Sequence, residues 1–208
     1  MDGNGSGTTE GKGAQTRRAI LDAAIARFGR DGFRATSVAD IARDAGVSGT
    51  AAYAYFPNKE ALFLAAVDED AAAVIEEGLS TIFDEVNVAD WRRRLIASLV
   101  DALEHRPLAR RLLGGLEPEV TVRVLEIPAL EELRKALSER LRSDQLVDRV
   151  RTDIDPVATA NAVVAIVLSM LMSVVQLGER AADFYADDIA AFFEAAIERT
   201  PPAPHPLP

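Results

Sequence analysis

Apolar residues near the start of the chain recur at the three- and four-residue spacing of one helix face. This spacing predicts a helix from about Thr16 to Arg30, followed by Gly32. A second helix is predicted from Ser37, which is a good N-cap with Asp40 three residues on as in a capping box, and Gly46 ends it. The apolar face of the first helix contains Ile20, Leu21, Ala24, Ile25 and Phe28.

A short third helix follows the second almost at once. Ser48 can cap its start, and it must end by Phe56 because Pro57 disfavours helical geometry in the residue before it. About eight residues at 1.5 Å each make a rod of roughly 12 Å, close to the ~12 Å width of the DNA major groove. Asn58 can cap a fourth, longer helix that begins at Lys59. Residues 36–59 therefore look like a helix-turn-helix that reads DNA, and two ordinary packed helices are the alternative.

The rest of the chain also shows helical spacing, and no alternating strand pattern stands out. Alanine, leucine, glutamate and arginine are abundant, which favours helix. Glycine and proline punctuate the segments at their ends. The predicted helices run from Lys59 to about Gly78, from Trp91 to about His105, from Pro107 to Gly114, from Pro128 toward Arg142, and from about Ala181 to Arg199.

The longest apolar run, Val157 to Leu177, contains no charged residue in 21 positions. Its length alone would allow it to span a membrane. Asp155-Pro156 is a simple helix start, and several polar residues interrupt the run. Small residues occupy one face of this helix, where another helix can approach closely. These small residues are Ala158, Ala162, Ala165, Ser169 and Ser173.

Composition narrows the class of protein. The chain of 208 residues is 49% hydrophobic, which is enough for a substantial core, and it has no cysteine. Disulfides and thiolate metal sites are thereby excluded, and a cytoplasmic location is the expectation. Residues 1–13 lack the apolar stretch of a signal peptide, and we expect them to be disordered, as we do the proline-rich residues 201–208.

Taken over the whole chain, the net charge of −10 argues against DNA as a partner, but the charge is unevenly distributed. Residues 1–67 contain eight basic and seven acidic side chains, a balance of +1, whereas the remainder carries −11. The acidic excess therefore lies outside the predicted helix-turn-helix. Basic residues remain there to meet phosphates, namely Arg17, Arg18, Arg27, Arg34, Arg43 and Lys59.

Residues 14–67 resemble the N-terminal domain of tetracycline-repressor-like (TetR) transcriptional regulators. The resemblance rests on ILDAAIARFGRDGFRATSVADIARDAGVS and on YAYFPNKEALF. Where that family often has Gly-Thr-Leu or Pro-Thr-Leu one residue after Val-Ser, this chain has Gly49 directly after Ser48, and Ala51 takes the usual hydroxyl position. The matching positions are Phe28, Gly32, Thr36, Ile41, Ala42, Ala45, Gly46, Val47, Ser48, Tyr53, Phe56, Lys59 and Leu62.

The resemblance implies an all-α fold with an N-terminal three-helix helix-turn-helix DNA-binding domain and a C-terminal helical ligand-binding and dimerisation domain. We expect these domains at residues 14–67 and 68–200. Members of the family are homodimers that bind palindromic operators, and they release the operator when a small molecule occupies the C-terminal domain. In the family the last two helices pair with their copies, and the two apolar helices at the end of this chain suit that role.

The resemblance also implies which residues meet DNA. Phosphate contacts are implied for Tyr53, Tyr55 and Lys59, and for Ser37 and the backbone amide of Val38. The predicted reading helix has no Arg, Asn or Gln for bidentate base contacts, so hydroxyl groups, contacts with thymine methyl groups and DNA shape must carry specificity. A core position is the alternative for the Tyr53 ring, and a solvated side chain is the alternative for Lys59. The DNA-binding prediction is completed by Ser48, Gly49, Thr50 and Ala51.

A ligand pocket in the C-terminal domain is the least defined part of the prediction. Possible lining residues are Trp91, His105, Met170, Gln176 and Tyr185, each of which can equally belong to the core or to an interface. His105 and His205 are the only histidines, so we expect no catalytic acid–base pair, no metal site and no cofactor.

The function that the sequence indicates is that of a homodimeric repressor released from a palindromic operator by a small molecule. Two alternatives remain open at this stage. One is a ligand-independent DNA-binding activator or nucleoid factor, and the other is a helical interaction or membrane-associated module.

Overall fold

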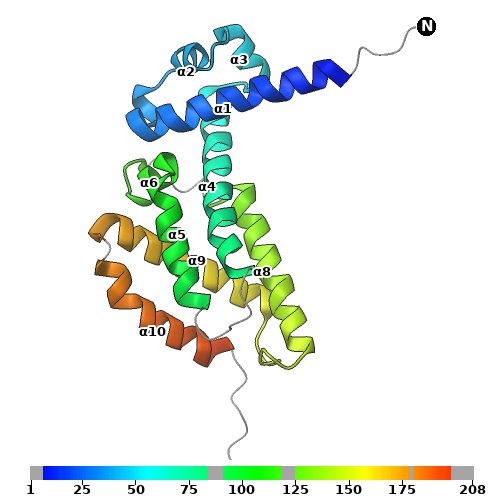
Figure 1. The fold of residues 1–208 in the computed structure, drawn as a ribbon, viewed down its shortest axis with the longest axis vertical. Helices are drawn as coiled ribbons and strands as arrows, with labels where there is room; N and C mark the ends of the chain where they lie inside the picture. Colours follow the sequence, from blue (N-terminus) through cyan, green and yellow to red (C-terminus); the bar gives the residue numbers. More distant parts are fainter. Residues whose placement is uncertain (1–6, 84–90, 119–124, 179, 198–208) are drawn as a thin grey trace, which may run out of the picture.

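The computed structural model describes residues 7–83, 91–118, 125–178 and 180–197, and the regular elements within these ranges are nine α-helices (Figure 1). The all-α prediction is thereby confirmed. The helices are α1 Gly7–Ala35, α2 Val38–Asp44, α3 Gly49–Tyr55, α4 Lys59–Phe83, α5 Trp91–Glu104, α6 Pro107–Leu113, α8 Pro128–Leu146, α9 Pro156–Leu177 and α10 Arg180–Ile197.

The predicted start of α1 was wrong. The helix begins at Gly7 rather than near Thr16, so the expectation of disorder does not hold for residues 7–13. Once a helix is nucleated, each added turn costs little, and the Thr16 hydroxyl donates to the Lys12 carbonyl in this extension at 2.9 Å. The proline-rich residues 201–208 lie outside the described residues. The division into domains at residue 67 stays a prediction.

The helices α1, α2, α3 and the start of α4 form a head around one apolar core. The Phe63 ring of α4 packs edge-on against Phe28 of α1, with ring centroids 5.0 Å apart, and its centroid is also 5.0 Å from that of Phe33. Burying rings of this size is a large favourable term in folding. Other buried members of this core are Ile20, Leu21, Ala24, Ile41, Ala42, Ala52, Leu62 and Ala66.

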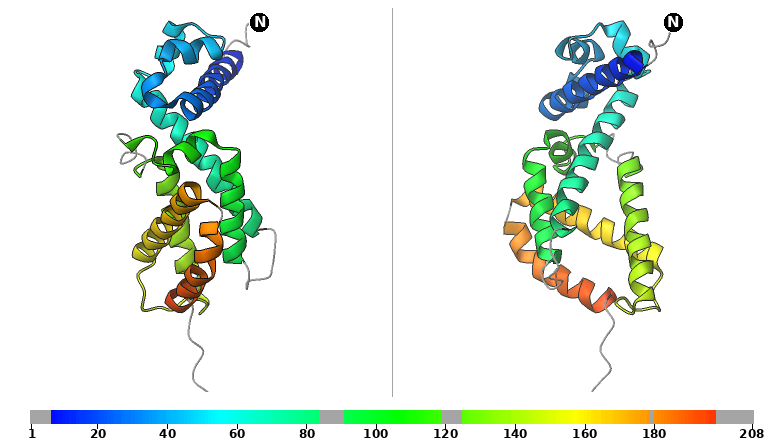
Figure 2. Two further views of the ribbon diagram at one scale, coloured as in Figure 1. Left: turned by 90° about the vertical axis from the view of Figure 1, so that its left-hand side faces the viewer. Right: turned by 45° about the vertical axis from the view of Figure 1, so that its right-hand side comes forward.

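The remaining helices form a body around the lower part of α4, which is the helix that runs from the head into the body (Figures 1 and 2). The α5 and α8 helices pack beside α4, α9 packs on α8, and α10 packs on α9. Part of the body core joins α4, α5 and α9, and its buried residues are Val74, Leu99, Ala102, Leu103, Met170 and Leu171.

A second connection between head and body is the contact of α1 with α6, which we call the junction. Its residues are Gly29, Gly32, Phe33, Pro107, Arg111 and Glu117. The helices come so close that a Cβ atom on Gly29 would lie 2.8 Å from the Cβ of Pro107. The backbone of Gly32 (φ 84°, ψ 170°) interrupts α1, and the Phe33 N–H then donates to Oε1 of Glu117 at 3.1 Å.

The α6 helix owes its position at the junction partly to α4. Arg106 at its N-cap position makes no side-chain capping bond. Instead, Oδ2 of the buried Asp70 on α4 accepts the Ala109 N–H at 2.8 Å, and burial raises the pKa of the Asp70 carboxyl. An acceptor at the start of a helix satisfies an otherwise unpaired donor, so this bond ties the first turn of α6 to α4.

Replacing Gly32 with alanine should destabilise the protein more than the same replacement at Gly178, a glycine of similar backbone geometry. Gly178 has φ 90° and ψ 171°, and a Cβ there would meet nothing within 4 Å, whereas at Gly32 it would lie 2.5 Å from both Arg111 and Glu117. Gly178→Ala should lower the free energy of unfolding by about 1–3 kcal/mol through backbone strain alone. Gly32→Ala should cost about 1–3 kcal/mol more, because it also disrupts a buried hydrogen bond. Urea unfolding of both variants measures this difference, and equal costs would contradict the role given to the junction.

Candidate nucleic-acid interface

The α2 and α3 helices lie at the end of the head that is furthest from the body, on the other side of α1 (Figures 1 and 2). Ser37 caps α2 by accepting the Asp40 N–H at 3.1 Å, and Ser48 caps α3 by accepting the Ala51 N–H at 3.1 Å. Gly46 makes the turn between the helices with φ 68°. The capping residues read from the sequence are thus confirmed, and α3 ends at Tyr55, before the extended Phe56, as Pro57 requires.

The α3 helix is anchored by one side and exposed on the other. Ala52 is fully buried against the head, and Phe56 just beyond the helix is also buried. The Tyr53 side of the helix faces solvent: Tyr53 is 53% exposed, so the alternative in which its ring fills the head core is wrong. Thr50 is exposed as well. A short helix presented in this way at one end of a molecule is able to enter the major groove.

The other residues predicted to contact DNA lie around α3 and at the start of α2. Ser37 and Ser48 are exposed, and Tyr55 is 36% exposed. The side chain of Val38 is buried, but Val38 is the first residue of α2, where backbone N–H groups lack helical partners. Gly49 and Ala51 are half-buried. The structure thus brings these positions to one end of the head, and their contacts with DNA stay a prediction.

Lys59 makes contacts within the head that the sequence did not indicate. Its Nζ donates to the Arg34 carbonyl at 3.4 Å and lies 4.5 Å from the centroid of the Phe33 ring. A cation beside carbonyl oxygens at the end of α1 is favourable. The alternative of a freely solvated lysine is therefore wrong.

Several basic side chains of the head are already paired with acids. Arg27 forms a two-bond pair with Asp44, at 2.6 and 3.0 Å, and this pairing holds the pKa of the Asp44 carboxyl below its usual range. Arg43 pairs with Asp40. Arg17 is exposed, with its guanidinium carbon 5.4 Å from the centroid of the Phe56 ring, next to the end of α3. Because Arg27 is held by Asp44, it joins α1 to α2 and is a poor candidate for a phosphate contact.

Of the five residues predicted to line a ligand pocket, three have described side chains, and these three lie in different surroundings. Met170 is buried in the core between α4, α5 and α9, whereas His105 is exposed after α5. The exposed Gln176 on α9 donates to the Leu113 carbonyl at 2.9 Å. The side chains of Trp91 and Tyr185 lie outside the described parts of the structure.

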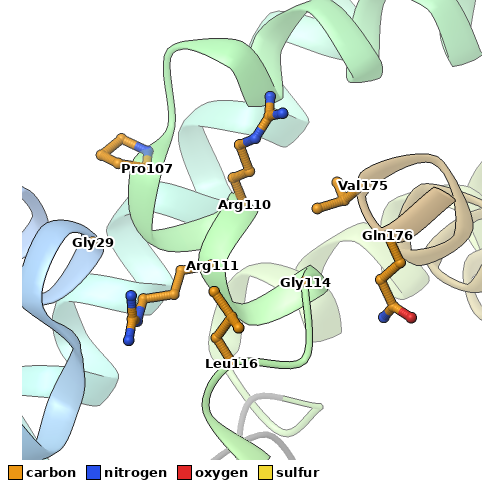
Figure 3. Close-up of a pocket in the computed structure, with 8 residues that line it drawn as sticks. All are labelled: Gly29, Pro107, Arg110, Arg111, Gly114, Leu116, Val175 and Gln176. Carbon is orange, nitrogen blue, oxygen red and sulfur yellow. The ribbon is translucent and has the colours of Figure 1, made fainter. Parts of the chain in front are cut away.

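Gln176 does line an open cleft of about 600 Å³ between α1, α6 and α9 (Figure 3). No sequence pattern pointed to the two arginines of the cleft, because adjacent charged residues on a short helix are usually solvated. In Figure 3 the side chains of Arg110 and Arg111 extend away from one another, so they do not form a two-arginine clamp. The lining residues are Gly29, Pro107, Arg110, Arg111, Gly114, Leu116, Val175 and Gln176.

Two further features bear on the alternatives. Among the described residues, no group of three or more His, Cys, Asp or Glu side chains could hold a metal ion. In the same residues one helix, α9, is long and apolar enough to cross a membrane, and 28% of its most apolar stretch is buried within the chain. In this structure α9 packs against four helices of the body, α5, α6, α8 and α10.

Comparison with known proteins agrees with this architecture. Residues 20–66 match the sequence model of the bacterial regulatory proteins of the tetR family. The chain is 31% identical over 174 residues to the HTH-type transcriptional repressor Rv1474c of Mycobacterium tuberculosis, covering 80% of this chain and 85% of the relative.

Solved structures share the fold over almost their whole length. FadR of Thermus thermophilus, a TetR family repressor in complex with lauroyl-CoA, has a TM-score of 0.64 at 23% identity, over 91% of this chain and 100% of that one. The fatty acid degradation regulator FadR of Bacillus halodurans has a TM-score of 0.65 at 16% identity, over 92% and 96% of the two chains. With its helix-turn-helix at the end of a helical body, the chain belongs to the tetR family of bacterial regulatory proteins and is a DNA-binding transcriptional regulator.

Proposed function

We propose that this protein is a homodimeric repressor that binds a palindromic operator through α3 and leaves it when a small molecule occupies the body. The observation that carries the proposal is the exposed outer side of α3 at the end of the head, held in place by a buried inner side. The relative from M. tuberculosis is named a repressor, which supports the direction of regulation. A role on DNA requires a cytoplasmic location, and we expect neither catalysis nor a cofactor.

Recognition by α3 would use small groups. The Thr50 hydroxyl can hydrogen-bond to a base edge, and the Ala51 methyl group can contact a thymine methyl group. Gly49 leaves the start of the helix without a side chain, so the backbone can come close to DNA. Ser37, the Val38 amide, Tyr53, Tyr55 and Lys59 would contact phosphates, which fixes the register of the head on the duplex. DNA shape would supply the rest of the specificity.

The outward face of α9 supports a dimer through α9 and α10. Its small-residue stripe is exposed at Ala158, Ala162, Ala165 and Ser169. The Ser169 hydroxyl donates to the Ala165 carbonyl at 2.8 Å, so it needs no partner outside its own helix. On α10, Phe192 is 57% exposed. A self-complementary apolar surface of this kind suits a two-fold interface, which would place two α3 helices about one DNA turn, ~34 Å, apart.

The effector would act by favouring one position of the head. FadR of T. thermophilus was solved with lauroyl-CoA, so a protein of this fold can hold a small molecule. In this chain the cleft between α1, α6 and α9 is lined by Gly29 of the head and by Arg110, Val175 and other residues of the body. A molecule that contacts both parts binds one head position better than another and shifts the population by that difference in affinity.

Tyr53 should contribute to DNA affinity through its hydroxyl. We expect Tyr53→Ala to weaken binding to duplexes that the wild type selects from a random library by about tenfold, the effect of one lost hydrogen bond to a charged group. Tyr53→Phe should lose nearly as much. Fluorescence anisotropy measures both affinities, with His105→Ala, an exposed change in the body, as the control. Unchanged affinity in Tyr53→Ala would remove Tyr53 from the interface.

The dimer should depend on the small-residue stripe of α9. Ser169 and Ser143 are both exposed serines whose hydroxyls donate to the carbonyl four residues earlier, but Ser143 lies on α8. Ser169→Arg should give monomers at concentrations where the wild type is a dimer, because a buried unpaired charge is costly. Ser143→Arg should remain dimeric. Sedimentation velocity measures the mass, and a dimeric Ser169→Arg would place the interface elsewhere.

A further inference from the structure

We propose that Glu117 is a positioning residue for DNA binding, which fixes the angle of the head by holding the backbone of α1 to α6. The inference rests on the proposed function, since it concerns how two heads of a dimer are set at the spacing of an operator. Glu117 lies in the body, one residue before the end of the described segment 91–118, and it is not one of the residues predicted to contact DNA.

The Glu117 carboxylate is shared between the two parts of the molecule. Its Oε1 accepts the Phe33 N–H of the head at 3.1 Å and the Nε–H of Arg111 on α6 at 2.7 Å. Glu117 is 8% exposed, so these bonds are largely shielded from water. Hydrogen bonds to an ionised group are stronger than neutral ones, and shielding strengthens them further.

The Phe33 N–H is available because Gly32 interrupts α1. With φ 84° and ψ 170°, Gly32 has a conformation that other residues adopt only under strain. An N–H group beside such a break needs another acceptor, because an unpaired buried donor is costly. The acceptor comes from a residue 84 positions away in the sequence. The break at Gly32 thus frees the Phe33 N–H, and the Glu117 carboxylate accepts it.

The hydrogen bond from the Phe33 N–H constrains the position of the whole head. The Phe33 ring lies 5.0 Å from Phe63 and 6.1 Å from Phe28, centroid to centroid, so residue 33 is fixed in the head core. On the body side, Arg111 belongs to α6, where Leu108 and Leu112 are buried and Asp70 holds the first turn. The bond therefore connects two rigid parts rather than two loose side chains.

The connection through α4 alone would leave the head freer to rotate. One helix crossing between two parts resists stretching, but it resists bending and twisting much less than two separate contacts do. The second contact is the junction, where Gly29 packs against Pro107 and Glu117 adds a directional bond to the backbone of Phe33. Loss of that bond should therefore leave each head able to bind DNA while loosening the spacing between the two heads.

The test measures how strongly the dimer prefers the half-site spacing of the selected palindrome. A loss of folding stability alone would not change this preference. Each base pair inserted between half-sites adds about 3.4 Å and roughly 35° of rotation. Affinity is measured for the palindrome selected by the wild type, for the same palindrome with two inserted base pairs, and for a duplex with a single half-site. The ratio of the first two affinities is the spacing selectivity.

In Glu117→Ala we expect the spacing selectivity to fall by about tenfold, within the range of typical coupling between sites, while affinity for the single half-site stays within about twofold of the wild type. Glu117→Gln keeps an oxygen of the same reach and should retain most of the selectivity. Gln145→Ala is the matched control, because Gln145 also holds two backbone carbonyls, of Arg151 and Ile154, but far along the chain within the body. It should keep the selectivity.

Unchanged selectivity in folded Glu117→Ala, or an equal loss in Gln145→Ala, would overturn the proposal. If Glu117→Ala does not fold, Glu117→Asp decides, because it keeps the charge but shortens the reach to Phe33; selectivity equal to that of the wild type then overturns the proposal. Failure of the wild type to select any palindrome would instead overturn the proposed function, so the two failures are distinguishable.

Discussion

The packing of Phe63 against Phe28 and Phe33 is the contact on which the rest of the structure depends. Phe63 belongs to the first turns of α4, and α4 continues into the body as the partner of α5 and α8. The aromatic cluster therefore makes the start of a body helix part of the head core. Without it, the connection through α4 would be loose, and the junction alone would couple the helix-turn-helix to the body.

Charged side chains of the head make contacts that hold the helices of the head together. Arg27 is used to join α1 to α2 through Asp44, and Lys59 contacts the end of α1 through Arg34 and Phe33. A domain with a balance near neutral can still bind a polyanion when helix N-termini and a few exposed basic groups face the same way. The starts of α2 and α3 are capped by Ser37 and Ser48, and their contact with phosphates stays a prediction.

Local features of the fold could be predicted because each depends on one or two neighbouring residues. Ser37 and Ser48 as N-caps, Pro107 at the start of α6 and Asp155 as the cap of α9 are signals of this kind. The start of α1 was missed because Gly7, Gly11 and Gly13 are poor helix formers, which argued against a helix in that stretch. The bond from Phe33 to Glu117 could not be predicted, because it joins residues far apart in the sequence and depends on how α6 packs. The same holds for the cleft, whose residues come from α1, from α6 and the turn after it, and from α9.

In the proposed dimer, two heads are held at an angle set by the junction. Because the chain has no cysteine, a spin label on Ala26→Cys, at an exposed position of α1, would report a single distance between the heads of a dimer. This arrangement predicts a measurable dipolar coupling by pulsed electron resonance, with a distance distribution that narrows when the selected palindrome is bound and broadens when Glu117 is replaced by alanine. No coupling, or a distribution that neither DNA nor the replacement changes, would contradict it.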